Sequence, residues 1–236
     1  MTAVRNSFLQ MVYMIRKDMM LVAACTGPVL AGAVFRFGIP MAERKLCDMF
    51  GKSFILQPYY ELFDLFLAVL APVLFCFVAA MVILEERDDK ITKYMFVTPL
   101  GRKGYLIARL GIPFVLAICI TVVLLPLFML TRQPLWMLLF LSVAGAVQGM
   151  MVALMIVTIS SNKLEGMAVS KLSTMTMLGF IVPYFIPDKV QYVLAPLPSF
   201  WMGKVVQCGN PMYILPMVLV SAVWIGFLLY RFGRNC

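Results

Sequence analysis

Long apolar runs separated by short polar connections make up most of this 236-residue chain. Runs of 18 or more apolar residues recur, which is the length a helix needs to cross a bilayer. The fifth run is short for a hydrocarbon core of about 30 Å, so a five-helix alternative stays open. The pattern predicts six membrane-spanning helices, over residues 19–41, 61–84, 105–130, 135–159, 172–186 and 212–230.

The first twenty residues follow a helical rather than an extended pattern. Their apolar side chains recur at the spacing of one helix face, and basic side chains cover much of the rest. Such a segment predicts an amphipathic helix that lies at the lipid headgroups. A simple cytoplasmic extension of the first span is the alternative. The apolar face consists of Phe8, Met11, Val12, Ile15 and Met19.

Two further connections differ from each other in character. Residues 42–60 are polar enough to predict a loop after the first span. Residues 187–211 are moderately apolar but are broken by Pro196 and Pro198, so they cannot form a straight span. We expect them to form a re-entrant hairpin, with Tyr192 and Trp201 at the membrane interface.

Composition supports the membrane class and narrows the chemistry. The chain is 63% hydrophobic and 13% charged, against about 25% charged in soluble domains, so we predict an all-α integral membrane protein. The chain has no histidine, which removes the usual general base and most zinc sites. It has no GxxxxGK[ST] motif, so it carries no phosphate-binding loop of its own. We expect no catalytic site in this chain.

The net charge of +9 is distributed unevenly among the connections. With six spans, thirteen of the 20 basic residues fall on the side that holds both termini and the connection after the second span, and seven fall on the other. The positive-inside rule therefore predicts cytoplasmic termini. The positive charge is explained in this way without a nucleic-acid partner.

Polar and small residues inside the spans leave two questions open. Arg36 and Asp64 are placed near the outer ends of adjacent spans, where they either take part in transport or simply pair and reach the interface. Gly145 and Gly149 form a GxxxG spacing, which favours either a dimerisation face or close packing within one bundle. Proline in the third span, at Pro113 and Pro126, predicts kinks.

The longest charged stretch, residues 85–104, reads EERDDKITKYMFVTPLGRKG. Helical spacing of Ile91, Tyr94 and Met95 predicts a short amphipathic helix, and Thr98-Pro99 interrupts it. Glu85, Glu86, Asp88 and Asp89 would lie at the N-terminus of that helix, where the macrodipole favours acid. A solvated loop with ordinary capping is the alternative.

Two segments carry a resemblance to a known family. The stretch VILEERDDKITKYMFVTPLGRKGYLIARL resembles the region after the second span in membrane subunits of type-2 ABC exporters. The stretch SSNKLEGMAVSKLSTM is similar to the connection after the fourth span in bacterial drug-export permeases, including those for fluoroquinolones. The predicted six spans, amphipathic N-terminal helix and broken hairpin also match the layout of that family.

The resemblance implies a permease in the plasma membrane of a bacterium. Its coupling segment would dock on two copies of a separate P-loop ATPase, which would bind ATP and magnesium, and a second permease subunit, identical or different, would complete the exporter. The cargo would be an amphipathic or hydrophobic compound such as a drug, a lipid-like molecule or a peptide. The predicted docking residues are Glu85, Glu86, Arg87, Lys90, Ile91, Tyr94, Met95, Thr98 and Pro99, with Lys163 and Glu165 as a second contact.

Other functions and contacts stay open. A standalone ion-coupled carrier or channel would need polar sites at the membrane midplane, and a non-transporting scaffold would use the charged segment only as a dock. Cys47 and Cys208 both fall in connections predicted to be external, where they are candidates for a disulfide. Candidate cargo-path residues in the fifth span are Met175, Met177, Phe180 and Tyr184.

Overall fold

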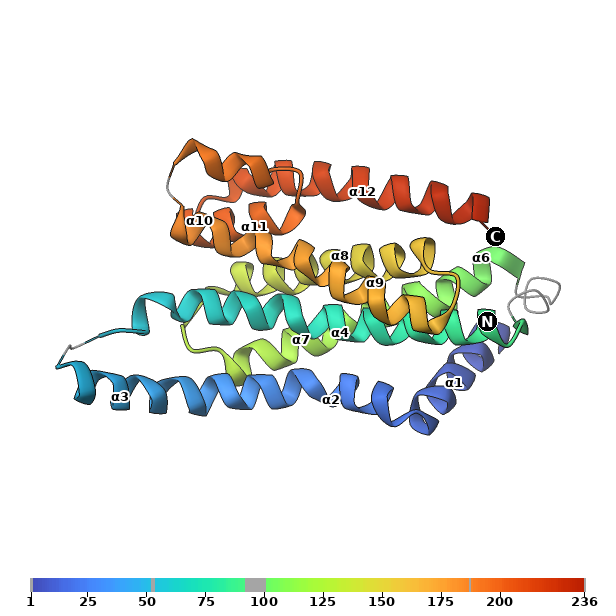
Figure 1. Cartoon of the computed structure of the whole chain (residues 1–236), viewed down its shortest axis with the longest axis horizontal. Coiled ribbons are helices and arrows are strands. Elements are labelled where there is room, and N and C mark those ends of the chain that lie inside the picture. Colours follow the sequence, from blue (N-terminus) through green and yellow to red (C-terminus); the bar gives the residue numbers. More distant parts are fainter. Residues whose placement is uncertain (1, 52–53, 92–100, 187, 236) are drawn as a thin grey trace.

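A computed structural model describes residues 2–51, 54–91, 101–186 and 188–235, and every regular element in these ranges is helical (Figure 1). Five helical stretches are long and apolar enough to cross a membrane: residues 19–50, 57–88, 104–128, 135–159 and 211–233. They run roughly along the long axis of the molecule. The two termini and α6 (Gly101–Leu106) lie at one end of this array, which we call the charged end.

The central helix of the array is α4 (Tyr60–Asp88), which packs most extensively on α8 (Leu135–Ile159). Seven consecutive α4 residues, numbers 78–84, are at most 2% exposed, so this part of the helix has no outward face. The helices α2 (Met19–Ala33) and α7 (Ile112–Phe128) also pack on α4, while α12 (Ile214–Asn235) covers α8. The core is therefore built around α4.

Close contact between α4 and α8 depends on small residues opposite a proline. A side chain at Gly145 would place its Cβ 2.2 Å from the Ala68 carbonyl oxygen, and one at Gly149 would lie 2.8 Å from that of Pro72. Pro72 has no N–H, so it cannot give the Ala68 carbonyl the usual helical hydrogen bond, and α8 approaches at this point. The GxxxG spacing thus serves packing within this bundle, as one of the two sequence interpretations held.

The predicted loop at residues 42–60 is wrong in its first half. The first long helix continues through a π-helical segment (Val34–Gly38) into α3 (Ile39–Phe50) and ends at Gly51, whose φ is +61°. The polar composition was misleading because Glu43 is used within the fold. Its carboxylate accepts hydrogen bonds from the Gln57 backbone N–H at 3.0 Å and from the Tyr60 hydroxyl. The N-terminal helix α1 is present over Thr2–Lys17.

A second correction concerns the charged stretch. The second span does not end at residue 84, because α4 continues to Asp88. Two residues later, Lys90 has a left-handed φ of 58°. Glu85 and Glu86 therefore occupy the last turn of a long helix rather than the first turn of a short one. The macrodipole disfavours acids at this position, so they need cationic partners.

The third span changes helix type next to the first of its two prolines, and the predicted kinks stay predictions. A π-helical segment, Ile107–Gly111, joins α6 to α7 and ends directly before the turn that contains Pro113. Pro113 thus occupies the first turn of α7, where its missing N–H costs least. Pro126 lies close to the end of α7 at Phe128.

The predicted fifth span is divided among three short elements: α9 (Lys163–Met175), a 3₁₀ segment (Thr176–Ile181) and α10 (Val182–Phe185). It is not among the five long apolar helices, so the count of six stays a prediction. Residues after it form a 3₁₀ turn (Lys189–Leu194), α11 (Pro198–Cys208) and a further 3₁₀ turn (Pro211–Tyr213) before α12. These helices lie at the end opposite the termini (Figure 1), and their insertion into a membrane remains a prediction.

The α4–α8 contact gives a direct stability test. We expect Gly145→Ala to lower the free energy of unfolding by about 1–3 kcal/mol, because the added Cβ must push α8 away from the Ala68 carbonyl. Thermal unfolding in detergent measures this. Gly226→Ala is the matched control, since no atom lies within 4 Å of its added Cβ. Equal unfolding temperatures for the two variants would contradict the packing argument.

Candidate functional site

The last turn of α4 joins segments that are far apart in the sequence. At the charged end of the array, this turn contacts the α1–α2 junction, the start of the third span and the connection between α8 and α9. We call the side chains that make these contacts the charged node. They are Asp18, Glu85, Glu86, Arg87, Asp88, Tyr105, Arg109 and Lys163.

The innermost part of the charged node is an ion pair with no exposed surface. Glu86 and Arg109 are each 0% exposed, and Arg109 pairs with the Glu86 carboxylate through Nη2 and, at 3.0 Å, through Nε. The Tyr105 hydroxyl donates to the same carboxylate at 2.8 Å. Burying two charges is costly unless they are paired and hydrogen-bonded, and this bidentate geometry meets both conditions. The pair fixes the end of α4 against the start of the third span.

A second ion cluster lies nearer the surface. Lys163 Nζ donates to Asp18 at 2.7 Å and to Glu85 at 3.0 Å. Asp18 also caps α2, accepting from the Met20 backbone N–H at 2.9 Å. One lysine at the start of α9 therefore holds both the α1–α2 junction and the last turn of α4.

These contacts shift the pKa values in opposite directions. The hydrogen bond from Lys163 holds the pKa of Asp18 below its ordinary 3.8, against the effect of burial. Burial works to lower the pKa of Lys163, but its hydrogen bonds to Asp18 and Glu85 outweigh this and raise the pKa above 10.5. Both groups are therefore charged across the neutral range.

The connection between α8 and α9 is held by backbone contacts as well. Arg87 donates to the carbonyl oxygens of Val157 at 3.1 Å and Ser160 at 2.8 Å, at the C-terminal end of α8 where the macrodipole favours a cation. Asp88 accepts from the Lys163 backbone N–H at 2.9 Å, at the start of α9 where an anion is favoured. Each charge thus lies at the helix end that stabilises it.

Asn162 and Glu165 complete the turn that presents Lys163. Asn162 accepts from the Glu165 backbone N–H at 2.8 Å, and Glu165 accepts from that of Ser161 at 2.7 Å. This is close to a capping box, in which each side chain satisfies a free backbone donor. Lys163 and Glu165 were predicted as a docking contact, and in this structure both also serve the fold.

The predicted docking residues separate into three groups. Glu86 is fully buried, whereas Glu85 and Arg87 are half-buried and bonded within the chain. Lys90 is exposed and Ile91 is half-buried at the boundary of the described part. Their docking role stays a prediction. Tyr94, Met95, Thr98 and Pro99 lie outside the described residues.

Four members of the charged node were not predicted as site residues from sequence: Asp18, Asp88, Tyr105 and Arg109. Asp18 lies before an apolar run with a free N-terminus to cap, which is a signal that sequence reasoning could have used. Tyr105 and Arg109 were taken as the ordinary start of a span. Arg109 carries a charge inside an apolar run and is 0% exposed, which local spacing alone does not reveal.

The candidate cargo-path residues do not share one surface. Met177 and Phe180 are buried in the core of the chain, and Phe180 packs on Phe66 at a ring distance of 6.1 Å. Tyr184 is half-buried, while Met175 is 63% exposed. Their role in transport therefore stays a prediction that most directly concerns Met175.

At the end opposite the charged node, Arg36 and Asp64 hold one turn. Asp64 accepts from the backbone N–H groups of Leu130 at 2.7 Å and Thr131 at 2.9 Å, and Arg36 donates to the Met129 carbonyl at 2.9 Å. Both charges thus fix the connection between α7 and α8. Cys208 is an exposed free thiol, so the predicted bond to Cys47 is not made in this structure.

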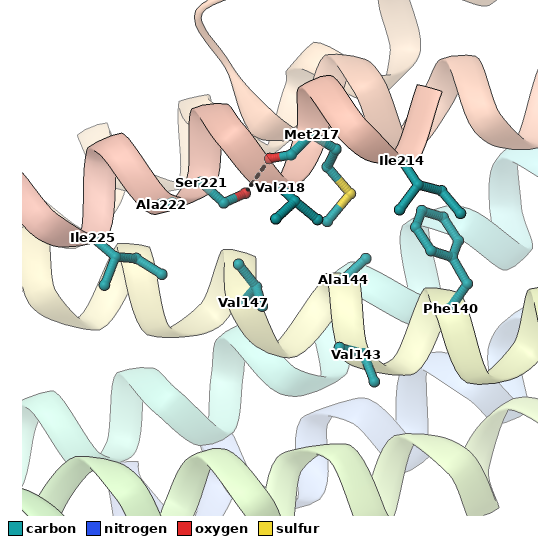
Figure 2. A pocket seen from close by; sticks show the side chains of 10 residues that line it. All are labelled: Phe140, Val143, Ala144, Val147, Ile214, Met217, Val218, Ser221, Ala222 and Ile225. Atoms are coloured by element: carbon teal, nitrogen blue, oxygen red, sulfur yellow. Dashed lines mark hydrogen bonds between the residues drawn. The ribbon is translucent and has the colours of Figure 1, made fainter. Parts of the chain in front are cut away.

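Apolar cavities open on the sides of the array, and two of them lie between packed helices. One, of about 280 Å³, lies between α8 and α12 (Figure 2). Ser221 is its polar side chain, and its hydroxyl already donates to the Met217 carbonyl at 2.7 Å. The other, of about 350 Å³, lies between α1, α2, α4 and α7, and Arg16 lines it. Among the described residues, no group of three or more His, Cys, Asp and Glu could hold a metal ion.

Comparison with known proteins gives one match. The profile of a family described as "Fluoroquinolones export permease protein Rv2686c-like" matches residues 11–232. No curated protein and no solved structure matches the chain significantly. The matched region contains the whole charged node and both cavities except for Phe8.

The buried pair of Glu86 and Arg109 predicts that removing one charge destabilises the protein more than removing both. Arg109→Met leaves the Glu86 carboxylate without its ion-pair partner, so we expect a loss of about 3–5 kcal/mol in the free energy of unfolding. The double variant Glu86→Leu, Arg109→Met removes both charges and should recover most of that loss. Unfolding in detergent measures all three proteins. A double variant less stable than either single variant would contradict this account.

The cluster of Asp18, Glu85 and Lys163 should contribute the same free energy of unfolding across the neutral pH range. Asp18 has a lowered pKa, so its contribution is present above pH 3.8 and is lost as the pH falls through its folded-state pKa. Lys163 has a raised pKa, so its contribution is present below pH 10.5 and is lost as the pH rises through its folded-state pKa. We expect Lys163→Met to cost about 1 kcal/mol. Unfolding temperatures should show the same loss at pH 5, 7 and 9.

The control for this measurement is Lys189→Met, which removes an exposed lysine at the opposite end of the array. It should leave the unfolding temperature nearly unchanged at each pH. A Lys163→Met effect that disappears between pH 5 and pH 9 would show that the cluster is not charged as described.

Proposed function

The chain belongs to the family of Rv2686c-like fluoroquinolone export permeases, and on that premise we propose that it is the membrane subunit of an ABC exporter. It would move an amphipathic or hydrophobic compound, such as a drug, a lipid-like molecule or a peptide, out of a bacterial cell. A separate P-loop ATPase would bind ATP and magnesium and supply the energy. Two ATPase copies and a second permease subunit, identical or different, would complete the complex.

The observation that supports this proposal is the charged node, which includes the first four residues of the segment 85–104. A force applied to that segment by an ATPase would act first on the last turn of α4. Through Glu86 and Arg109 it would reach the third span, and through Lys163 it would reach the α1–α2 junction and α9. A permease driven from outside the chain needs such a rigid connection between its docking segment and several helices.

The proposal includes six membrane crossings with both termini in the cytoplasm. Residues 172–186, from the last turn of α9 through α10, would be the fifth crossing. Lys163 at the start of α9 bonds to the charged end, while Phe185 at the end of α10 stacks on Tyr59 at a ring distance of 5.7 Å, near the opposite end of the array. An even number of crossings agrees with two termini at the same end (Figure 1). The basic connections would then face the cytoplasm.

Co-purification tests the ATPase partnership. We expect the tagged permease to retain a P-loop ATPase subunit that is co-expressed with it. Tyr94→Ala with Met95→Ala should lower that retention at least tenfold, because two apolar anchors of the docking contact are removed. Val123→Ala is the matched truncation away from the segment, since Val123 lies on α7 and is 60% exposed. Equal retention by all three proteins would exclude the docking role of residues 94 and 95.

Transport is measured separately on the reconstituted complex. Inside-out proteoliposomes with both subunits should accumulate norfloxacin only when ATP and magnesium are added. The accumulation should persist when ion gradients are collapsed, which separates an ATP-driven exporter from an ion-coupled carrier. A complex that binds the ATPase but moves no compound would favour a membrane scaffold instead.

A further inference from the structure

The cavity between α1, α2, α4 and α7 has a charged rim and an apolar interior. Its walls include Met11 and Ile15 from α1, Phe75 and Val78 from α4, and Leu116 and Ile120 from α7. Arg16, in the last turn of α1, is exposed and lines the same cavity. The volume of about 350 Å³ falls within the range of ligand pockets, roughly 300–1,000 Å³.

The cavity has a charged end and an apolar end, as an amphiphile has. Arg16 lies two residues before Asp18, so the cationic rim is beside the half-exposed Asp18–Lys163–Glu85 cluster at the charged end. Ile120 lies about 10 Å further along α7 than Pro113, toward the middle of the array. One end of the cavity therefore carries the cationic Arg16, the charged residue among those that line it, while the other end extends between apolar helix faces.

From these observations we propose that the cavity binds an anionic phospholipid. One acyl chain would fill the apolar part, and the headgroup phosphate would lie at Arg16. Arginine suits this role because its planar guanidinium presents several donors to phosphate oxygens. A basic residue at the membrane surface also favours an anionic over a zwitterionic headgroup. This inference stands apart from the transport proposal, since it concerns lipid bound to the permease alone.

The second cavity supplies an internal comparison. The α8–α12 cavity is of similar size, about 280 Å³, but its lining contains no basic residue (Figure 2). An acyl chain could enter it without regard to the headgroup. Selectivity for anionic lipid is therefore expected at the cavity between α1, α2, α4 and α7, which we call the α1 cavity. It is not expected at the α8–α12 cavity.

Native mass spectrometry of the full-length permease tests the headgroup preference. The probes are palmitoyl-oleoyl phosphatidylglycerol and palmitoyl-oleoyl phosphatidylcholine, which have the same acyl chains. We expect the wild type to retain phosphatidylglycerol roughly fivefold better, and Arg16→Gln to abolish that preference. Lys17→Gln is the control, because it removes a neighbouring charge that lies over the Tyr13 ring and does not line the cavity. Equal effects of the two variants, or no preference in the wild type, would overturn the proposal.

Photo-crosslinking tests the position of the acyl chain. Phosphatidylglycerol with a diazirine in one chain should label α4 and α7 peptides that line the α1 cavity. Thr26→Phe fills the exposed rim of the cavity and should reduce this labelling, whereas Val115→Phe, on an exposed α7 position outside it, should not. Labelling confined to α8 and α12 would overturn the proposal. Displacement of the lipid by equimolar norfloxacin would also overturn it, in favour of a cargo site.

Discussion

The buried pair of Glu86 and Arg109 is the interaction on which the charged end of this molecule depends. Glu86 lies at the C-terminal end of α4, where the macrodipole opposes a carboxylate, and it has no exposed surface. Only a cation placed within the protein can compensate both costs. Arg109 does so from the π-helical segment before Pro113, and this requires the third span to begin directly beside the end of the second.

This constraint also determines how the two ends of the array differ. Around Gly145 and Gly149, α4 and α8 meet through backbone contact, which depends on shape and leaves little freedom to shift. At the charged end, the same two helices and α9 meet through Arg87, Asp88 and Lys163, whose bonds are directional and separate. Packing therefore keeps α4 and α8 together as a unit. The ionic contacts determine which other segments are attached to that unit at the charged end.

The apolar runs allowed most of the long helices to be predicted from sequence, because crossing a membrane imposes a length and a composition on each one. The errors fell where charge was taken as the end of a helix. Residues 85–88 and Glu43 are polar, yet they lie in helices because partners elsewhere satisfy them. Lys163 is 145 residues from Asp18 and 78 from Glu85, so no local pattern indicates that these side chains meet. The predicted docking residues Tyr94, Met95, Thr98 and Pro99 lie outside the described part of the chain.

The division of α9–α10 follows from the same pairing logic. Thr176 begins the 3₁₀ segment, and its hydroxyl both donates to the Ser173 carbonyl at 2.6 Å and accepts from Gln148 at 3.0 Å, while its own carbonyl accepts from Ser199 at 2.5 Å. At the break, the Thr176 carbonyl is thus satisfied by α11 and the Thr176 hydroxyl by α8. Lys163 bonds α9 to the charged node, whereas α11 packs on the 3₁₀ segment and α10. The two halves of the segment are therefore held by different neighbours. A movement of the charged node would therefore reach α9 before it reached α10.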